Sequence, residues 1–327
     1  MATAIVIREY GGSNVLKPEE IEVGAPSASE LLIRQTGIGV NFHDVYVRSG
    51  LYQTLSLPGI PGCEAVGVIE EVGEGVEGLS VGDRVAYVTG TYGAYASHRL
   101  LDANLALHVP DTVPDAMVAT NLLRAMTVDM LVSQVARIKQ GDTILVQAAA
   151  GGVGRLLCQW ASDLGVTVIG TVGSEERAEE AKASGCTHTI LYRQVEFVEA
   201  VRDLTDGLGV DVAYDSVGAD TFHGSLDTLK PTGHLVNFGQ SSGPVKPLEM
   251  SQLAAKSLTV SRPILFHYMA ELATYQTMAS SVFGAFTSGV LAVSAPKVLP
   301  LAEAWRSHEI LEGRTGGGSL MLDPAVS

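Results

Sequence analysis

The fold of this protein is decided by residues 145–154, which read Leu145-Val-Gln-Ala-Ala-Ala-Gly-Gly-Val-Gly154. A compact apolar run at residues 143–148 leads into this glycine turn, and a helical run at residues 153–164 leaves it. A strand, a glycine turn and a helix in this order favour dinucleotide binding, because small residues let a pyrophosphate approach the free N–H groups of the helix N-terminus. A tight turn without a ligand is the alternative interpretation. The expected pyrophosphate contacts are Ala150, Gly151, Gly152 and Val153.

Beyond this turn, apolar and helical runs alternate as far as residue 261. Gly154 is expected to let the first helix pack closely on its strand. Strands that alternate with helices of this length indicate a parallel sheet covered on both faces, and about six strands are what a doubly wound Rossmann domain needs. The expected fold class is therefore α/β. Further strands are expected at residues 166–171, 189–191, 211–215, 234–238 and 258–261, and helices at residues 175–184, 195–204 and 221–229.

The first third of the chain is β-rich, with short apolar or alternating runs separated by Gly/Pro clusters. These runs occupy residues 4–8, 30–38, 65–72, 84–88 and 98–101, and the first long helical run covers residues 116–137. The tail is expected to form a helix at 269–289, a strand at 298–301, a helix at 302–311 and a strand at 319–322. Because the tail is too small to be a domain, we expect it to complete the first one. The expected domains are residues 1–121 with 263–327, and residues 122–262.

Length, charge and cysteine usage limit the possible functions. The 327 residues suggest about two domains. Lys plus Arg number 21 and Asp plus Glu number 36, and the resulting formal charge of −15 argues against a nucleic-acid partner. The most apolar run, residues 282–295, is short and interrupted by polar residues, so no membrane span is expected. The N-terminus lacks the basic segment of a signal peptide, and three widely spaced cysteines make no disulfide framework, which favours a cytoplasmic protein.

The residues after the second strand of the cofactor domain indicate which dinucleotide is bound. NAD sites usually place an acidic residue about 20 residues after the glycine turn, where it binds the ribose 2′-OH. Here Gly173 holds this position, followed by Ser174, which can hydrogen-bond a 2′-phosphate, and Arg177, which can pair with it. We therefore expect NADP(H). An inward turn of Glu175 or Glu176 would favour NAD instead, and a solvated helix charge is the alternative interpretation of Arg177.

Further cofactor contacts are expected where the strands end, because open α/β sheets bind ligands at the carboxyl ends of their strands. Tyr192 follows the third strand and is expected near the adenine edge. Gly218 follows the fourth strand and permits a close backbone approach. The residues at the end of the fifth strand complete this set. They are Phe238, Gly239, Gln240 and Ser241. For Phe238, packing in the core is the alternative interpretation.

The glycine turn is part of a longer pattern, Gly141-Asp142, Leu145, residues 149–154, Gln159 and Ser162. This pattern resembles the signature of the quinone oxidoreductase/zeta-crystallin group of the medium-chain dehydrogenase/reductase superfamily, which includes NADPH:quinone reductases and 2-haloacrylate reductases. The resemblance covers nearly the whole chain and implies a GroES-like catalytic domain, built from the first third and the tail, with a Rossmann domain inserted. Four other segments agree with it: GVNFHD at 39–44, RSGLY at 48–52, YDSVG at 214–218 and SRP at 261–263.

The resemblance implies which residues form the catalytic site. It places Asn41, with an amide hydrogen to donate, on the nicotinamide side, where it serves both catalysis and cofactor binding. It implies Tyr46 and Tyr52 as phenol donors to a carbonyl oxygen or as walls of the pocket, with Tyr46 also against the cofactor. Asp44 is expected to be a structural or cofactor-orienting acid rather than a general base. The alternatives are a turn-stabilising Asn41 and tyrosines that only pack. His43 has no visible partner in the sequence and receives no role.

Three further cofactor contacts are implied by the same resemblance: Thr127, Arg262 and Gly317. The Thr127 hydroxyl is expected near the phosphate or the nicotinamide ribose, and the other two reach back toward the cofactor. Several relatives carry aromatic residues two and three positions after this threonine. Here those positions hold Asp129 and Met130, which leaves the preferred acceptor open.

The sequence predicts no metal site. Zinc enzymes of the superfamily use Cys and His where this chain has Asn41 and Cys63, and an amide is a poor zinc ligand. Without a Lewis acid to hold an alkoxide, the easier reaction is hydride transfer from NADPH to an electrophilic quinone or α,β-unsaturated carbonyl. The alternatives are a reductase of a specific C=C bond, of the enoyl or 2-haloacrylate type, and a non-catalytic, crystallin-like NADPH-binding protein. The resemblance also implies a homodimer, paired through the edge strand at 258–261.

Overall fold

The computed structural model describes residues 1–313 and 318–326. It divides into two compact units. The first unit comprises Met1–Leu123, Val282–Thr287 and Val293–Ser327, and the second comprises Arg124–Ser281 and Ser288–Ala292. The second unit is therefore an insertion within the first.

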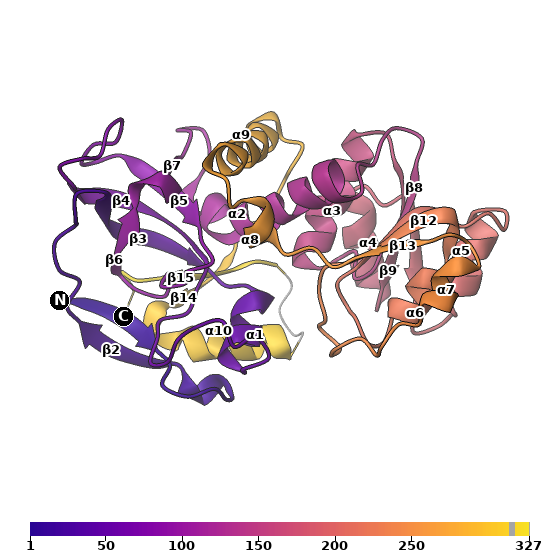
Figure 1. The fold of residues 1–327 in the computed structure, drawn as a ribbon, viewed down its shortest axis with the longest axis horizontal. Coiled ribbons are helices and arrows are strands. Elements are labelled where there is room, and N and C mark those ends of the chain that lie inside the picture. Colours follow the sequence, from indigo (N-terminus) through magenta and orange to yellow (C-terminus); the bar gives the residue numbers. More distant parts are fainter. Residues whose placement is uncertain (314–317, 327) are drawn as a thin grey trace. The chain divides into compact units, whose positions relative to one another are not determined.

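The second unit is built on a six-stranded sheet with the strand order β10-β9-β8-β11-β12-β13 (Figure 1). Every neighbouring pair is parallel, and the order reverses beside β8, where consecutive crossovers change direction. This topology confirms the prediction of a doubly wound Rossmann sheet. The strands are β8 (Thr143–Val146), β9 (Thr167–Val172), β10 (His188–Leu191), β11 (Val210–Asp215), β12 (Leu229–Asn237) and β13 (Thr259–Ser261).

Helices cover both faces of this sheet, with α3 and α4 on one face and α5, α6 and α7 on the other (Figure 1). This division follows from right-handed crossovers. From β8 the chain adds strands toward β10, and from β11 it adds strands toward β13, so the two sets of helices lie on opposite faces. Apolar strand residues such as Leu145, Ala213 and Leu235 pack with Phe222 and Leu226 of α6 in the core. The helices are α3 (Gly152–Asp163), α4 (Glu175–Ala183), α5 (Phe197–Leu204), α6 (Phe222–Asp227) and α7 (Met250–Ala254).

The first unit is built on a sheet with the strand order β14-β15-β3-β4-β5-β7, with β6 also paired to β3. Its pairs are antiparallel except β14 with β15, which is parallel. The tail strand β15 pairs with β3, with Met321 opposite Gly39, so the tail returns to the first third of the chain. A separate antiparallel pair, β1 and β2, completes the β-structure. The strands are β1 (Ala2–Val6), β2 (Lys17–Ile21), β3 (Glu30–Gly39), β4 (Glu64–Val72), β5 (Arg84–Val88), β6 (His98–Asp102), β7 (Leu107–His108), β14 (Lys297–Pro300) and β15 (Leu320–Asp323).

A short helix within the β-rich third, α1 (Phe42–Arg48), was not among the expected elements. It begins with a reciprocal capping box, in which the Asn41 side chain accepts from the N3 backbone and the Asp44 side chain accepts from the Asn41 backbone N–H at 2.8 Å. Two otherwise unsatisfied helix N–H groups are thereby bonded, which stabilises a helix of only two turns.

The helix expected at 116–137 is α2 (Asp115–Asp129), followed by a π-helical turn, Met130–Val135. The helix expected at 269–289 is α9 (Leu272–Ser288), and it is preceded by a short helix, α8 (Leu265–Tyr268), that was not expected. The last helix, α10, covers Ala304–Glu312. The expected domain boundary at 262/263 also differs, because the second unit continues to Ser281. The Ser281 hydroxyl donates to Asp129 Oδ1 at 2.9 Å, which fastens α9 to α2 within that unit.

Among the described residues, no helix combines the length and the apolar character that a bilayer crossing requires. All three cysteines are buried free thiols. Cys158 and Cys186 lie together, with their sulfur atoms 3.3 Å apart, although they are distant in sequence.

Candidate functional site

The glycine turn between β8 and α3 has the backbone that close approach of a ligand requires. Ala148 adopts a positive φ of 56°, and its carbonyl accepts the Gly151 N–H at 2.8 Å. Gly151 is the N-cap residue of α3 in extended conformation. A Cβ on Gly154 would lie 2.3 Å from the Ala148 carbonyl oxygen, so only glycine permits this packing of helix on strand. The close contact predicted for Gly154 is therefore made with the turn that follows β8, and residues 150–153 line the N-terminus of α3.

An arginine to which sequence reasoning gave no role lies at the same turn. The buried Arg124 guanidinium sits beside Gly152, and a Cβ there would be 3.1 Å from its Cζ, Nε and Nη1 atoms. A fixed positive charge next to a helix N-terminus adds to the attraction for a phosphate group. The sequence offered one indication of this role, because Arg124 lies three residues before Thr127, a predicted cofactor contact.

A buried chain of hydrogen bonds supports the turn from behind. Gln147 accepts from the Thr171 hydroxyl at 2.6 Å and donates to Ser225 Oγ at 3.0 Å. Ser225 in turn donates to Asp215 Oδ2 at 3.0 Å, and Asp215 Oδ1 accepts the Gly218 N–H at 2.9 Å. This chain connects β9, β8 and β11 and fixes the loop that holds Gly218.

The loops that follow β11 and β12 lie against each other at the carboxyl edge of the sheet. Gly218 has a φ of +91°, and a Cβ there would be 2.7 Å from the Gly243 carbonyl oxygen. A Cβ on Gly239 would be 2.5 Å from the Ser216 carbonyl oxygen, which the Ser241 N–H reaches at 3.3 Å. Gln240 and Ser241 are half-buried in the same loop. Phe238 is also half-buried.

The tip of β9 gathers the residues predicted to recognise the 2′-phosphate. Ser174 is the N-cap of α4, and its hydroxyl accepts the Arg177 N–H at 3.4 Å. The Arg177 guanidinium pairs with Glu180 at 2.9 Å. The Tyr192 hydroxyl would lie 3.0 Å from a Cβ on Gly173.

Two findings at this tip bear on the choice of dinucleotide. Glu175 and Glu176, the residues that would have favoured NAD, are exposed. Arg193, to which sequence reasoning gave no role, lies next to Gly173 and above the Tyr192 ring, with its Cζ 6.0 Å from the ring centre. The tip therefore carries a second guanidinium.

In the first unit, Asn41 is fixed by two partners. Its backbone N–H donates to Asp44, and its side-chain amide donates to Glu64 Oε1 at 2.6 Å. Glu64 is fully buried, and its other oxygen accepts the Leu123 N–H of α2 at 2.7 Å. These contacts are those of the turn-stabilising interpretation of Asn41, and Asp44 caps the start of α1.

The two predicted tyrosines belong to one aromatic cluster with His43 and Tyr92. The ring centres of Tyr46 and Tyr52 are 5.1 Å apart, and those of His43 and Tyr52 are 5.6 Å apart. His43 stacks on Tyr92 at 5.9 Å, with 18° between the planes. The structure therefore brings Tyr46 and Tyr52 together and adds two rings that sequence reasoning left without a role.

Three predicted cofactor contacts remain, and the structure describes two of them. Thr127 is half-buried on α2, and Arg262 donates to the Asn237 carbonyl at 3.1 Å. Asp129 and Met130 are buried, and burial raises the pKa of the Asp129 carboxyl. Gly317 falls outside the described residues.

Comparison with known proteins identifies the family. Residues 27–111 match the alcohol dehydrogenase GroES-like domain, and residues 152–282 match the zinc-binding dehydrogenase domain. The chain is 41% identical to the 2-haloacrylate reductase of a Burkholderia species, over 99% of both chains. It is also 41% identical to the quinone oxidoreductase of Salmonella typhimurium, over 99% of this chain and all of that one. The chain belongs to the quinone oxidoreductase family.

A solved structure of this family agrees with the fold described above. The quinone oxidoreductase of Escherichia coli, complexed with NADPH, matches with a TM-score of 0.95 and 39% identity, over 98% of this chain and all of that one. The match confirms the predicted pairing of a GroES-like domain with a Rossmann domain.

The residues of this family member do not fit the zinc ion that the second domain's name suggests. The Asn41 amide donates to Glu64, so it offers a hydrogen rather than a lone pair. Burial, followed by the charges of Asp44 and Glu64, raises the pKa of the Cys63 thiol well above its usual value, and zinc binds the thiolate. No group of three or more His, Cys, Asp or Glu side chains is placed to hold a metal within residues 1–313 and 318–326.

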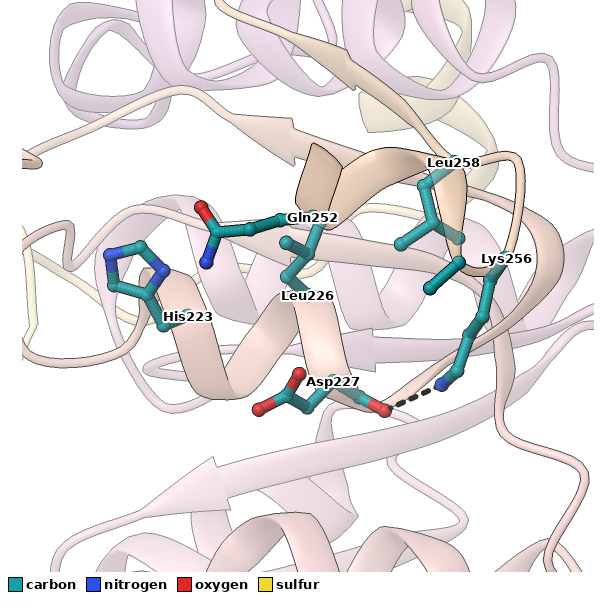
Figure 2. Close-up of a pocket in the computed structure, with 7 residues that line it drawn as sticks. His223, Leu226, Asp227, Gln252, Lys256 and Leu258 are labelled. Carbon is teal, nitrogen blue, oxygen red and sulfur yellow. Dashed lines mark hydrogen bonds between the residues drawn. The ribbon is translucent and has the colours of Figure 1, made fainter. Parts of the chain in front are cut away.

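A surface pocket in the second unit lies between α6 and α7 (Figure 2). Lys256 crosses it and donates to the carbonyl oxygens of Asp227 and Leu229 at 3.0 and 2.7 Å. This lysine therefore caps the carboxyl end of α6, where a cation is favourable. The pocket is lined by His223, Leu226, Asp227, Gln252, Ala255, Lys256 and Leu258, none of which was predicted as a site residue.

Proposed function

We propose that this protein is an NADPH-dependent oxidoreductase that transfers a hydride to a quinone or to an activated α,β-unsaturated carbonyl. The observation that carries the choice of NADPH is the tip of β9. There, glycine stands in place of the acidic residue of NAD sites. The Tyr192 hydroxyl and Arg193 Nε lie beside it, and Ser174 and Arg177 follow it at the start of α4. Two guanidinium groups and a helix N-cap hydroxyl suit a phosphate dianion.

The rest of the proposed cofactor site follows the sheet edge. The helix N-terminus at residues 150–153, with Arg124 beside it, holds the pyrophosphate. Gly218 and residues 238–241 approach the cofactor at the ends of β11 and β12, and Thr127, Arg262 and Gly317 complete the set. When bound, NADPH supplies the hydride.

For the acceptor, we propose Asn41, Tyr46 and Tyr52. Hydride addition to a quinone or enone places negative charge on an oxygen, and fixed hydrogen-bond donors stabilise that charge. Asn41 is held rigidly by Glu64 and Asp44, so it loses little freedom when the acceptor binds. The two tyrosines offer phenol donors and flat surfaces for a ring.

We also propose that the reaction proceeds without zinc. The residues at the two ligand positions, Asn41 and Cys63, are a hydrogen-bonded amide and a buried, protonated thiol. The protein's contribution is then positioning and hydrogen bonding, which suffices for an acceptor that is already electrophilic.

The 41% identity to a 2-haloacrylate reductase favours a second candidate, the reduction of one specific C=C bond. The two functions differ in the atom that receives the hydride, a β-carbon in one case and the quinone ring system in the other. A non-catalytic, crystallin-like role predicts NADPH binding without turnover.

An acceptor screen with NADPH and NADH side by side tests these proposals. Oxidation of NADPH by benzoquinone or naphthoquinone, faster than that of NADH, supports the quinone function. Oxidation with 2-haloacrylate or simple enones but with no quinone would select the C=C reductase. Tight NADPH binding without oxidation by any acceptor would select the binding protein.

Oligomeric state and location are also proposals. β13 is the edge strand of the cofactor sheet, and an exposed edge offers unpaired backbone groups to a second copy. We propose a homodimer paired there, which size-exclusion chromatography with light scattering tests. We propose a cytoplasmic location because three buried free thiols suit a reducing compartment.

A further inference from the structure

One hydrogen-bonded chain in the first unit has no role in the hydride transfer proposed above. His43 Nε2 lies 3.3 Å from the Tyr92 hydroxyl, which also bonds the Thr54 hydroxyl. Tyr92 is only 4% exposed, whereas Thr54 is exposed. The three side chains therefore form a continuous path from solvent, through a buried phenol, to an imidazole.

The imidazole end of this chain lies among the residues proposed for the acceptor. His43 belongs to α1, two residues after Asn41, and its ring contacts that of Tyr52 at 5.6 Å. Tyr52 contacts Tyr46 at 5.1 Å. A proton that leaves His43 therefore starts beside the aromatic rings proposed to hold the quinone.

The backbone of Tyr92 adopts a conformation that costs energy. Its φ is +61°, a left-handed value that is unusual for a bulky side chain. In this conformation the phenol oxygen lies within hydrogen-bond reach of both His43 and Thr54. Strained residues of this kind cluster at functional sites.

Quinone reduction needs the proton that such a chain can deliver. A hydride brings two electrons and one proton, and leaves a hydroquinone monoanion that needs one more proton. We propose that His43 gives this proton to the reduced quinone oxygen, and that Tyr92 and Thr54 replace it from solvent. The inference rests on the proposed quinone function.

The proton balance closes without any further reagent. The His43 Nδ1–H bond breaks as the O–H bond of the hydroquinone forms, and Nε2 takes the Tyr92 proton. Tyr92 takes the Thr54 proton, and Thr54 takes one from water, so one solvent proton is consumed for each quinone. His43 is then protonated on Nε2, and after the product leaves, return of that proton along the chain with uptake of a water proton at Nδ1 restores the starting tautomer without net proton change. Burial lowers the pKa of His43 to about 4 and raises that of Tyr92 to about 12, so both rest neutral, as this order requires.

The first test compares quinones whose hydroquinone monoanions differ in basicity. His43→Phe keeps the ring but removes its nitrogens, and Tyr92→Phe keeps the ring but removes the hydroxyl. With alkyl-substituted quinones, whose monoanions are strongly basic, we expect each variant to lower kcat about 100-fold. With halogenated quinones, whose monoanions need little help, we expect the loss to shrink toward none.

Tyr10→Phe is the matched control. Its hydroxyl donates to the Leu55 carbonyl at 3.1 Å, in the same loop as Thr54 and outside the hydrogen-bonded chain of His43, Tyr92 and Thr54. The variant removes a hydrogen bond to the same loop but leaves the relay intact, so we expect kcat to stay near the wild-type value with every quinone. A loss in Tyr10→Phe equal to that in Tyr92→Phe would mean that the hydroxyls only hold the loop.

A second readout needs no cofactor. Nitrogen NMR of the His43 ring in the free protein should show the proton on Nδ1, with Nε2 as acceptor, and Tyr92→Phe should shift the Nε2 resonance. A proton on Nε2, or equal kcat losses across the quinone series, would overturn the relay while the wild type remains an active quinone reductase. A wild type that reduces no quinone would instead reject the proposed function, and the relay with it.

Discussion

The side-chain amide of Asn41 donates a 2.6 Å hydrogen bond to the buried carboxylate of Glu64. The second Glu64 oxygen accepts the Leu123 N–H, so one carboxylate joins the start of α1 to α2. The same amide is the donor proposed for the acceptor oxygen. In the proposed reaction, stability and catalysis therefore depend on one side chain.

Asn41→Ala tests this double dependence. It removes the N-cap of α1 and one donor to a fully buried carboxylate, which should cost about 1–3 kcal/mol in the free energy of unfolding. Urea unfolding measures the loss. The exposed Asn14→Ala is the control, with an expected change below about 0.5 kcal/mol. Equal stability of both variants would show that the contact with Glu64 contributes nothing.

Gly154→Ala tests the packing of α3 on β8. The added Cβ would lie 2.3 Å from a backbone oxygen, so α3 must move and binding of NADPH and NADH should fall together. Gly284→Ala, also inside a helix, meets no atom within 4 Å and should stabilise by about 0.5–1 kcal/mol. Thermal unfolding and cofactor titration measure both effects. Unchanged cofactor affinity in Gly154→Ala would contradict the assigned role of the turn.

Arg177→Ala tests recognition of the 2′-phosphate. Loss of one charge-assisted hydrogen bond, about 1.5–3 kcal/mol, should raise the Kd of NADPH by at least tenfold and leave that of NADH nearly unchanged. Lys182→Ala, which breaks the exposed pair with Glu179 on the same helix, should change neither. An equal loss for both cofactors would refute the role of Arg177. Arg193→Ala should reproduce the effect if the second guanidinium shares the phosphate.

His308 makes stability depend on pH. Its Nε2 lies 3.1 Å from the Tyr95 hydroxyl, which donates to Asp44 at 3.2 Å. Burial and then the nearby Arg48 charge lower the pKa of His308 from 6.5 to about 3. Between these values the unfolded chain binds a proton that the folded protein does not, so stability falls as the pH drops from 6.5 toward 3. The slope from this group is at most about 1.4 kcal/mol per pH unit.

His308→Gln should flatten that slope, because glutamine keeps a donor for the Tyr95 oxygen and does not titrate. Urea unfolding at several pH values between 4 and 7 measures it. A slope identical to that of the wild type would mean that other groups carry the acid sensitivity.

The sequence predicted the six strands of the second unit because their signals are local, but it missed the short helices α7 and α8. Each of these strands is encoded by consecutive residues. The glycine turn indicates that a ligand is expected at the carboxyl edge of the sheet. The short helix α1 was missed because its stability comes from the reciprocal cap of Asn41 and Asp44 rather than from a long apolar stripe.

Contacts between residues distant in sequence were beyond the same reasoning. His43 meets Tyr92, 49 residues away, and Arg124 meets Gly152 across the glycine turn. Asp129, whose position left the acceptor open, is bonded to Ser281 of α9. Local patterns do not encode such pairs, because only the folded chain brings their backbones together.

The most direct test of the proposed NADPH:quinone reduction uses the purified wild type, benzoquinone, and NADPH with and without deuterium at its transferable position. We predict enzyme-dependent oxidation of NADPH with one hydroquinone formed per cofactor, a slower rate with the deuterated form, and much slower oxidation of NADH. Absence of enzyme-dependent hydroquinone formation, or a rate with NADH equal to that with NADPH, would contradict the account.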